Sequence, residues 1–107
     1  MHNIQQMMKK AQELQSKVTA LQEQAKSMIV EGKAGGGLVT ATVTCAGEVK
    51  RIELDISLIK PEEKEMLEDL IAASVNDARK NADAKMNAEM QKITEASGMP
   101  AGMKLPF

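Results

Sequence analysis

Residues 28 to 55 read MIVEGKAGGGLVTATVTCAGEVKRIELD, and they decide the fold because they hold the only β-like pattern in the chain. Between residues 38 and 45, apolar side chains alternate with three threonines, which is the period of a strand with one face toward a core. Apolar and charged residues alternate again over residues 51–56, after an Ala46-Gly47 turn. We expect these two strands to pair through a tight hairpin. The threonine face is either solvated or turned toward a partner strand.

A shorter alternating segment over residues 28–33 precedes Gly35-Gly36-Gly37 and predicts a third strand. Three consecutive glycines permit a sharp turn or a bulge with positive φ angles. A phosphate-binding loop is the functional alternative, but the segment has neither the Lys-Ser/Thr ending of a P-loop nor the dinucleotide fingerprint. The glycines therefore favour a structural turn.

A long helix is predicted on the N-terminal side, from about residue 3 to residue 27. Its apolar residues recur three and four positions apart without an intervening Pro or Gly, which is a heptad seam. The seam consists of Ile4, Met7, Ala11, Leu14, Val18, Leu21, Ala25 and Met28. Such a helix would be roughly 37 Å long at 1.5 Å per residue. The seam either packs on its own domain or pairs, at least partly, with another helix.

A second long helix is predicted from about residue 61 to residue 97. Pro61 suits a first helical turn, and Glu62 and Glu63 suit the positive end of the helix dipole, although no good N-cap residue precedes them. A wide apolar stripe in the first half is typical of a helix that covers a sheet. The whole helix would be about 55 Å long, so we expect its second half to project as an arm. A flexible tail is expected over residues 98–107, ending in Phe107, the only aromatic residue.

The predicted fold is α+β, with the order α-β-β-β-α in a single domain of 107 residues. The core that such a chain buries alone is small. Small cores are commonly supplemented by a metal, a disulfide or a partner, but the lone Cys45 cannot form an intramolecular bridge and the lone His2 lies near the terminus. We therefore expect a homo-oligomer.

The sequence offers no constellation typical of catalysis, and we expect no enzyme activity, no cofactor and no small-molecule substrate. Nothing places His2 beside Cys45 as a nucleophile and base, and the carboxylates follow one helix without His or Cys at metal-ligand spacing. No apolar run reaches the roughly 20 residues that span a bilayer, and the N-terminus lacks the apolar region of a signal peptide. We expect a cytoplasmic protein that does not enter the membrane.

Charge is unevenly distributed although the formal net charge is only −1. Residues 61–77 are strongly acidic, whereas residues 1–30 and 78–107 are each slightly basic. Aromatic content is too low for stacking on single strands, so any nucleic-acid role rests on phosphate contacts along a duplex. Lysines beside an apolar seam are also commonly just solvated flanks. The candidate DNA-binding residues are Lys9, Lys10, Lys17, Arg79, Lys80, Lys85 and Lys92.

The chain resembles the YbaB/EbfC family of bacterial nucleoid-associated DNA-binding proteins almost from end to end. The resemblance rests on MMKKAQELQ, EGKAGGGLVTATVTCAGEVKRIELD, PEEKEMLEDLIAASVNDARKNA and SGMPAGMKLPF, in that order. It implies an α-β-β-β-α subunit that forms a homodimer, whose projecting helices bind double-stranded DNA in a tweezer-like arrangement. Some relatives carry a glycine-rich segment before the first helix, and MHNIQQMM lacks it.

The leading hypothesis is therefore a nucleoid-associated protein that holds double-stranded DNA between basic helical arms through backbone and shape contacts, with a role in nucleoid organisation and gene regulation. The alternative is a coiled-coil module that binds unfolded proteins, similar in element order to prefoldin-like chaperones. Nine methionines favour that alternative because methionine makes adaptable apolar contacts, although the same residues also serve ordinary packing.

Overall fold

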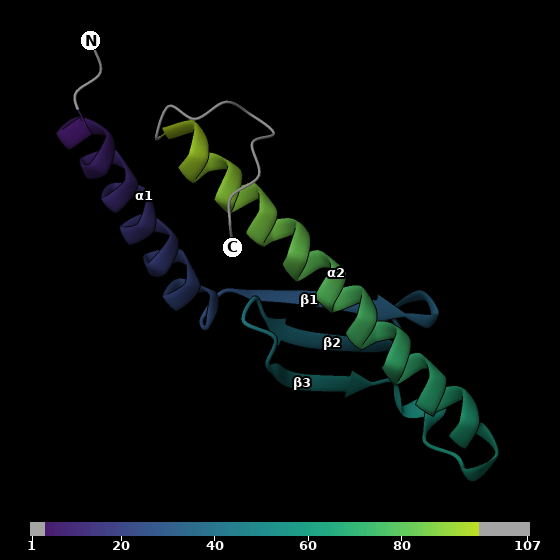
Figure 1. Ribbon diagram of the computed structural model, residues 1–107. Helices are drawn as coiled ribbons and strands as arrows, with labels where there is room; N and C mark the ends of the chain where they lie inside the picture. The colour runs from purple at the N-terminus through teal and green to yellow at the C-terminus, as the bar shows by residue number, and fades with distance from the viewer. Residues whose placement is uncertain (1–3, 97–107) are drawn as a thin grey trace.

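The computed structural model describes residues 4–96 as an elongated molecule with extents of 72 × 22 × 17 Å (Figure 1). Helix α1 (Ile4–Ala25) leads into the strands β1 (Ile29–Ala34), β2 (Val39–Thr44) and β3 (Val49–Leu54), and helix α2 (Lys64–Ala96) follows. The α-β-β-β-α prediction is confirmed. The tail expected at residues 98–107 and His2 lie outside the described residues.

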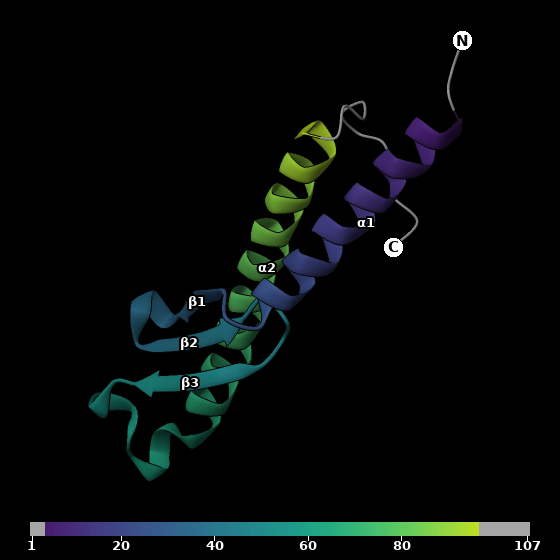
Figure 2. The ribbon, with the colours of Figure 1, turned by 90° about the vertical axis from the view of Figure 1, so that its left-hand side faces the viewer.

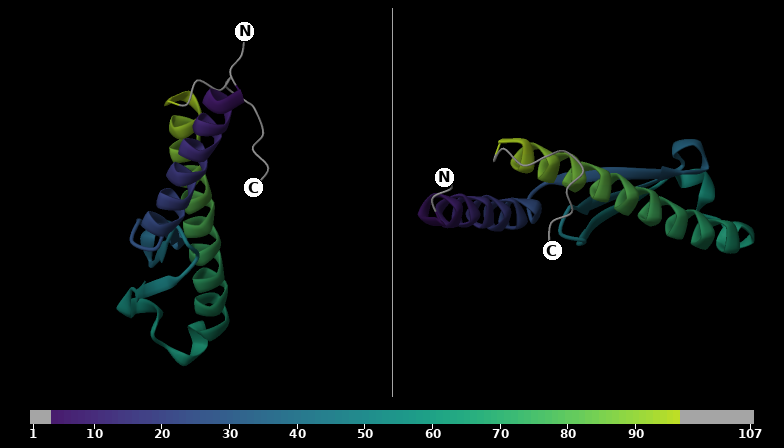
Figure 3. Two further views of the ribbon diagram at one scale, coloured as in Figure 1. Left: turned by 60° about the vertical axis from the view of Figure 1, so that its left-hand side comes forward. Right: turned by 45° about the horizontal axis from the view of Figure 1, so that its top comes forward.

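The three strands form one antiparallel sheet in the order β1-β2-β3. The alternation in β2 has the predicted effect, because Val39, Ala41 and Val43 are fully buried and the intervening Thr40 and Thr42 are half-buried on the opposite face. Helix α2 crosses the apolar face of the sheet, as Figure 3 shows, and contacts β1 and β2. Ala41 and Val43 pack there against Ala78 and Ala82, which form the centre of the core.

Short turns connect the strands. The triple glycine forms a single 3-10 turn, Gly35–Gly37, in which all three residues have positive φ angles. Its structural role is the one expected from the sequence. At the β2–β3 hairpin, Gly47 also has a positive φ of 99° and donates its N–H to the Thr44 carbonyl at 3.0 Å. The hairpin predicted at Ala46-Gly47 is therefore confirmed.

Helix α2 is fixed to β1 by contacts that the sequence pattern did not reveal. The Asp77 carboxylate accepts a hydrogen bond from the Lys33 N–H at 2.9 Å, and the Asn81 side chain donates to the Glu31 carbonyl at 2.8 Å. Between these two bonds lies Gly32, which is buried directly beneath the α2 backbone at Ser74 and Ala78. A helix can approach a strand this closely only where the strand has no side chain.

The entry to α2 differs slightly from the prediction. Ile56 is not the end of a strand but the start of a 3-10 turn, η2 (Ile56–Leu58), and a second turn, η3 (Pro61–Glu63), precedes the α-helix. Lys60 occupies the N-cap position of η3 without a side-chain hydrogen bond, which agrees with the absence of a cap residue in the sequence. Asp55 caps η2, where its Oδ1 accepts a hydrogen bond from the Ser57 N–H at 2.9 Å.

The cap at Asp55 predicts a pH dependence of stability. Hydrogen bonds from Ser57, first from its side chain and then from its backbone, lower the pKa of the Asp55 carboxyl below its ordinary value of 3.8. A lowered folded-state pKa stabilises the protein above the unfolded-state pKa, and this contribution is lost as the pH falls through the folded-state value. Asp55→Ala should lower the thermal midpoint at pH 7, and the difference from the unmodified protein should shrink at pH 3 and below. A constant difference over this range, measured by circular dichroism, would contradict the assignment.

Helix α1 lies beyond the end of the sheet and packs on the second half of α2 (Figure 1). Only the part of its heptad seam nearest the sheet is covered, with Val18, Leu21 and Ala25 buried. Ile4 and Met7 at the other end are 71% and 59% exposed. The seam therefore pairs with another helix over part of its length.

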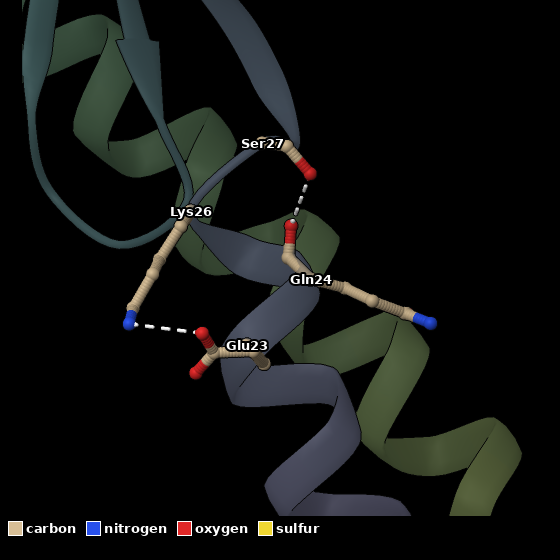
Figure 4. Close-up of polar contacts among 4 residues, drawn as sticks. All are labelled: Glu23, Gln24, Lys26 and Ser27. Atoms are coloured by element: carbon tan, nitrogen blue, oxygen red, sulfur yellow. Dashed lines mark hydrogen bonds and ion pairs between the residues drawn. The ribbon is translucent and has the colours of Figure 1, made fainter.

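The junction between α1 and β1 is a compact turn (Figure 4). The Gln24 carbonyl at the helix end accepts hydrogen bonds from the Ser27 hydroxyl at 3.0 Å and from the backbone N–H groups of Ser27 and Met28 at 2.9 and 3.1 Å. Lys26 forms an ion pair with Glu23 at 3.1 Å. The bonds to the Gln24 carbonyl close the turn that joins α1 to β1.

Candidate nucleic-acid interface

All seven basic residues predicted to bind DNA are exposed, but the structure places them in two groups. Those on the arm formed by α1 and the second half of α2 are Lys9, Lys10, Lys17, Lys85 and Lys92. Arg79 and Lys80 lie nearer the sheet, beside the core residues Ala78 and Ala82. The arm itself is visible in Figure 2, where both helices extend away from the sheet on the same side.

On α1, the lysines are divided between two sides of the helix. Lys10 and Lys17 are seven residues apart, so two turns of helix bring them to nearly the same side, next to the apolar seam. Lys9 is rotated by about 100° from Lys10 and points away from the seam. None of the three has an ion pair with another described residue. Their charges are therefore available to a ligand.

On α2, Lys85 and Lys92 repeat the same seven-residue spacing. Lys92 forms an ion pair with Glu89 at 3.3 Å, and its side chain remains 71% exposed. Exposed pairs of this kind contribute little energy, so a phosphate can replace the carboxylate. Lys85 forms no ion pair with a described residue. Each helix of the arm thus presents one pair of lysines two turns apart.

Arg79 belongs to a different surface. It lines a shallow cavity of about 360 Å³ at the β2–β3 hairpin, together with Gly47 and Asp83 among others. Lys80 is rotated by about 100° from Arg79 around the helix axis and is exposed. The structure therefore does not place these two residues on the faces that carry the arm lysines.

Acidic side chains are concentrated in η3 and the first half of α2. They are Glu62, Glu63, Glu65, Glu68, Asp69 and Asp77, opposed only by Lys64. Lys64 is itself paired with Glu68 at 2.9 Å. The charge along α2 is therefore uneven, because the arm half carries Lys85 and Lys92 against three carboxylates, Asp83, Glu89 and Glu95, and is less acidic than the segment before it. The acidic cluster of residues 62–77 disfavours an anionic ligand at that end of the molecule.

Neutral polar residues on α1 were missed by the charge-based prediction. The surface of α1 away from the seam has a shallow depression, lined in part by Gln12, Gln15, Ser16 and Thr19. Amide and hydroxyl groups are frequent partners of phosphate oxygens. Their recurrence opposite the seam is a signal that the sequence contains, but it is weak because the same residues also suit a solvated helix face.

Other kinds of site find little support in residues 4–96. No group of three His, Cys, Asp or Glu side chains in this part of the chain is arranged to hold a metal ion. Within the same residues, no helix is long and apolar enough to cross a membrane. Cys45 is half-buried and free.

Comparison with known proteins identifies close relatives. Residues 1–99 match the model of the YbaB/EbfC DNA-binding family. A nucleoid-associated protein of Granulibacter bethesdensis is 44% identical over the whole of both chains. A nucleoid-associated protein of a Bradyrhizobium species is 51% identical over 90% of this chain and 91% of its own. The relative from Rickettsia bellii, also named a nucleoid-associated protein, is 45% identical over both full lengths.

A solved structure has the same fold. The crystal structure of an uncharacterized protein from Helicobacter pylori superposes with a TM-score of 0.66 over 82% of this chain and 92% of its own, at 24% sequence identity. The sequence relatives carry the stronger argument, because they extend over the entire sheet and both helices of the arm. The chain therefore belongs to the YbaB/EbfC family of nucleoid-associated DNA-binding proteins.

Proposed function

We propose that this protein binds double-stranded DNA as a homodimer, through the lysines on its projecting arms. The observation that carries the proposal is the position of the exposed lysines, which lie in seven-residue pairs on both helices of the arm, away from the acidic cluster of residues 62–77. The chain has a single aromatic residue, which disfavours binding to single strands by base stacking. Recognition would rest on phosphate contacts and the shape of the duplex, as part of the organisation of the nucleoid and of gene regulation.

The salt dependence of binding tests this proposal. If about four to six phosphates are neutralised, the logarithm of the binding constant should fall with the logarithm of the salt concentration with a slope of about −4 to −5. Gel retardation of a duplex between low and physiological salt measures that slope, with a single strand of the same sequence as the comparison. No retardation at low salt with micromolar dimeric protein would refute the proposal.

The apolar face of β3 supports the homodimer. Helix α2 contacts β1 and β2 extensively and leaves β3 largely uncovered. Val49 and Leu54 lie on the same face of the sheet as the core residues Val43 and Val39, yet they are 41% and 39% exposed. A second copy that covers this face would bury the side chains that the chain's own helix does not reach.

Leu54→Lys tests this surface. A charge at the centre of an apolar interface should raise the dissociation constant of the dimer about 30-fold or more, since residues in such positions contribute about 2 kcal/mol. Sedimentation velocity over a range of concentrations measures the effect. Glu53→Lys is the matched control, because Glu53 is the neighbouring residue on the opposite face of the sheet. A dimer unaffected by Leu54→Lys would exclude this face from the interface.

The alternative of a prefoldin-like module has less support in the geometry. Such modules pair two helices of matched length, whereas α1 has 22 residues and α2 has 33. The first half of α2 covers a sheet and is not free to grip a client. Suppressed aggregation of a denatured protein, without retardation of DNA, would favour this alternative.

A further inference from the structure

The sheet has one face on which no described α-helix packs extensively. Helix α2 packs on the apolar face, and alternate residues of each strand point to the other side. Strand pairing arranges six of these residues in two rows across the sheet, here called the polar face. The first row is Glu31, Thr42 and Arg51, and the second row is Lys33, Thr40 and Glu53. The sequence pattern does not decide whether the threonines of this face meet water or a partner.

Opposite charges alternate at the four corners of the polar face. Each row ends in one carboxylate and one cation, and the two rows have them in opposite order. Glu31 and Lys33 on β1 are exposed and form no ion pair with a described residue. Arg51 pairs with Glu53 on β3 at 3.4 Å, and both side chains are more than half exposed. Exposed pairs of this kind contribute little energy, so all four charges are available to a partner.

The centre of the polar face carries two hydroxyls without a partner in the described part of the chain. Thr40 and Thr42 are half-buried between the charged corners. Neither side chain forms a hydrogen bond with another described residue, whereas the Thr44 hydroxyl on the same strand accepts one from the Glu48 N–H at 3.1 Å. A hydroxyl both donates and accepts, so a surface that offers hydroxyls of its own would satisfy these two.

We propose that the polar face pairs with the polar face of a second copy, at a contact separate from the apolar face of β3 that is proposed for the homodimer. A two-fold axis that lies between the two sheets, perpendicular to the strands, places each row opposite the other row of the partner. Glu31 then faces the partner's Lys33, and Arg51 faces the partner's Glu53. The threonines of the two copies meet in the middle. Because a two-fold contact repeats each interaction, every charge and hydroxyl of the polar face has a complementary group opposite it.

The charge pattern favours a second copy over a nucleic acid or a basic protein segment. The two carboxylates and the two cations cancel, so the polar face has no net charge to attract phosphates or a polybasic chain. The polar face is about 10 Å wide, given a spacing of about 4.8 Å between strands, so the contact is small and its association is weak and transient. Together with the dimer contact, it joins dimers into a tetramer or a longer array.

Sedimentation velocity of the full chain tests the proposal in the absence of DNA. At submillimolar protein, the association through the polar face should weaken at least about 10-fold between about 50 mM and about 500 mM salt, because exposed ion pairs are screened. The same salt-dependent association should remain in a Leu54→Lys background, which separates this contact from the proposed dimer. Equal association at the two salt concentrations would overturn the proposal.

Two charge reversals on β3 give a sharper test. Arg51→Glu leaves two negative charges on the β3 part of the polar face, and Glu53→Arg leaves two positive charges. Each variant alone should associate at least about 10-fold more weakly than the unmodified protein at low salt, since like charges then face each other across the contact. An equimolar mixture of the two variants should restore the association. Such restoration identifies a contact between copies, because a change within one chain is not reversed by mixing.

Lys60→Glu and Glu62→Lys are the matched controls. They change the net charge by the same amounts at the entry to α2, outside the polar face, and both should associate like the unmodified protein. A mixture of Arg51→Glu and Glu53→Arg that associates no better than either variant alone would refute the proposal. So would an equal loss in the controls, since net charge and not the polar face would then govern association.

Discussion

Replacing Gly32 by Ala should destabilise the protein by about 3 kcal/mol, the upper end of the range for overpacked cores. A Cβ atom at this position would overlap the backbone N and Cα of Ala78 and the carbonyl oxygen of Ser74. These are backbone atoms of α2, which cannot rotate away as a flexible side chain can. The helix would have to move off β1, and the hydrogen bonds of Asp77 and Asn81 to that strand would be strained or lost.

Urea and thermal unfolding followed by circular dichroism measure this effect. The thermal midpoint should fall by about 15 °C, given roughly 5 °C per kcal/mol for a domain of this size. Lys33→Ala is the control on the same strand, because Lys33 is exposed and its change should lie within about 0.5 kcal/mol. An unfolding curve of Gly32→Ala equal to that of the unmodified protein would contradict the close approach of α2 to β1.

Reversing the charge of Lys85 and Lys92 together should reduce affinity for a DNA duplex about 60-fold at 0.1 M salt. Each phosphate contact contributes a factor of about 8 at this salt concentration, and the slope of the salt dependence should become shallower by about 2. Both side chains are exposed, and Lys92 loses only a surface ion pair with Glu89. Folding should therefore be unaffected, and the dimer should persist.

The matched control reverses Lys60 and Lys64, which changes the net charge equally at the acidic end of α2. This control should alter affinity only weakly, since the change is far from the arm. Equal losses in the two variants would mean that net charge, not the position of the lysines, determines binding. If Lys85→Glu with Lys92→Glu dissociates the dimer instead, these side chains belong to the interface between subunits.

The sequence predicted the elements because their signals are local. The alternation of Val39, Ala41 and Val43 with threonines indicated β2, and the glycine at position 47 indicated the hairpin. The local sequence pattern did not indicate the contacts between elements. Gly32 resembles any other glycine in a strand until α2 is placed on it. The heptad seam did not indicate that only part of α1 is covered by α2. The covered length depends on the angle between the two helices and not on the spacing of apolar residues along α1.

The sequence also indicated how the candidate lysines are arranged on their helices, while their role in binding stays a prediction. Seven-residue spacing correctly placed Lys10 with Lys17, and Lys85 with Lys92, on common helix faces because helical geometry is regular. It did not separate Arg79 from the arm, since the contact of Arg79 with the β2–β3 hairpin arises only in the folded chain. The neutral side chains Gln12, Gln15, Ser16 and Thr19 of α1 could not be identified from the charge pattern. The folded structure shows that they line one depression on the helix surface.

Helix α2 is uninterrupted from Lys64 to Ala96. We therefore expect it to tilt as one rigid body, so that a tilt of the part on the sheet also moves the part that carries Lys85 and Lys92. The pivot of such a tilt, here called the fulcrum, is the close contact of α2 with Gly32. The segment from Ala78 to Ala96 is about 27 Å long, and a tilt of about 10° at the fulcrum would displace its end by roughly 5 Å. Successive phosphates along a DNA strand are about 3.4 Å apart along the axis. In the proposed complex with DNA, the contact at Gly32, a residue without a side chain, would thus determine which phosphates the arm reaches.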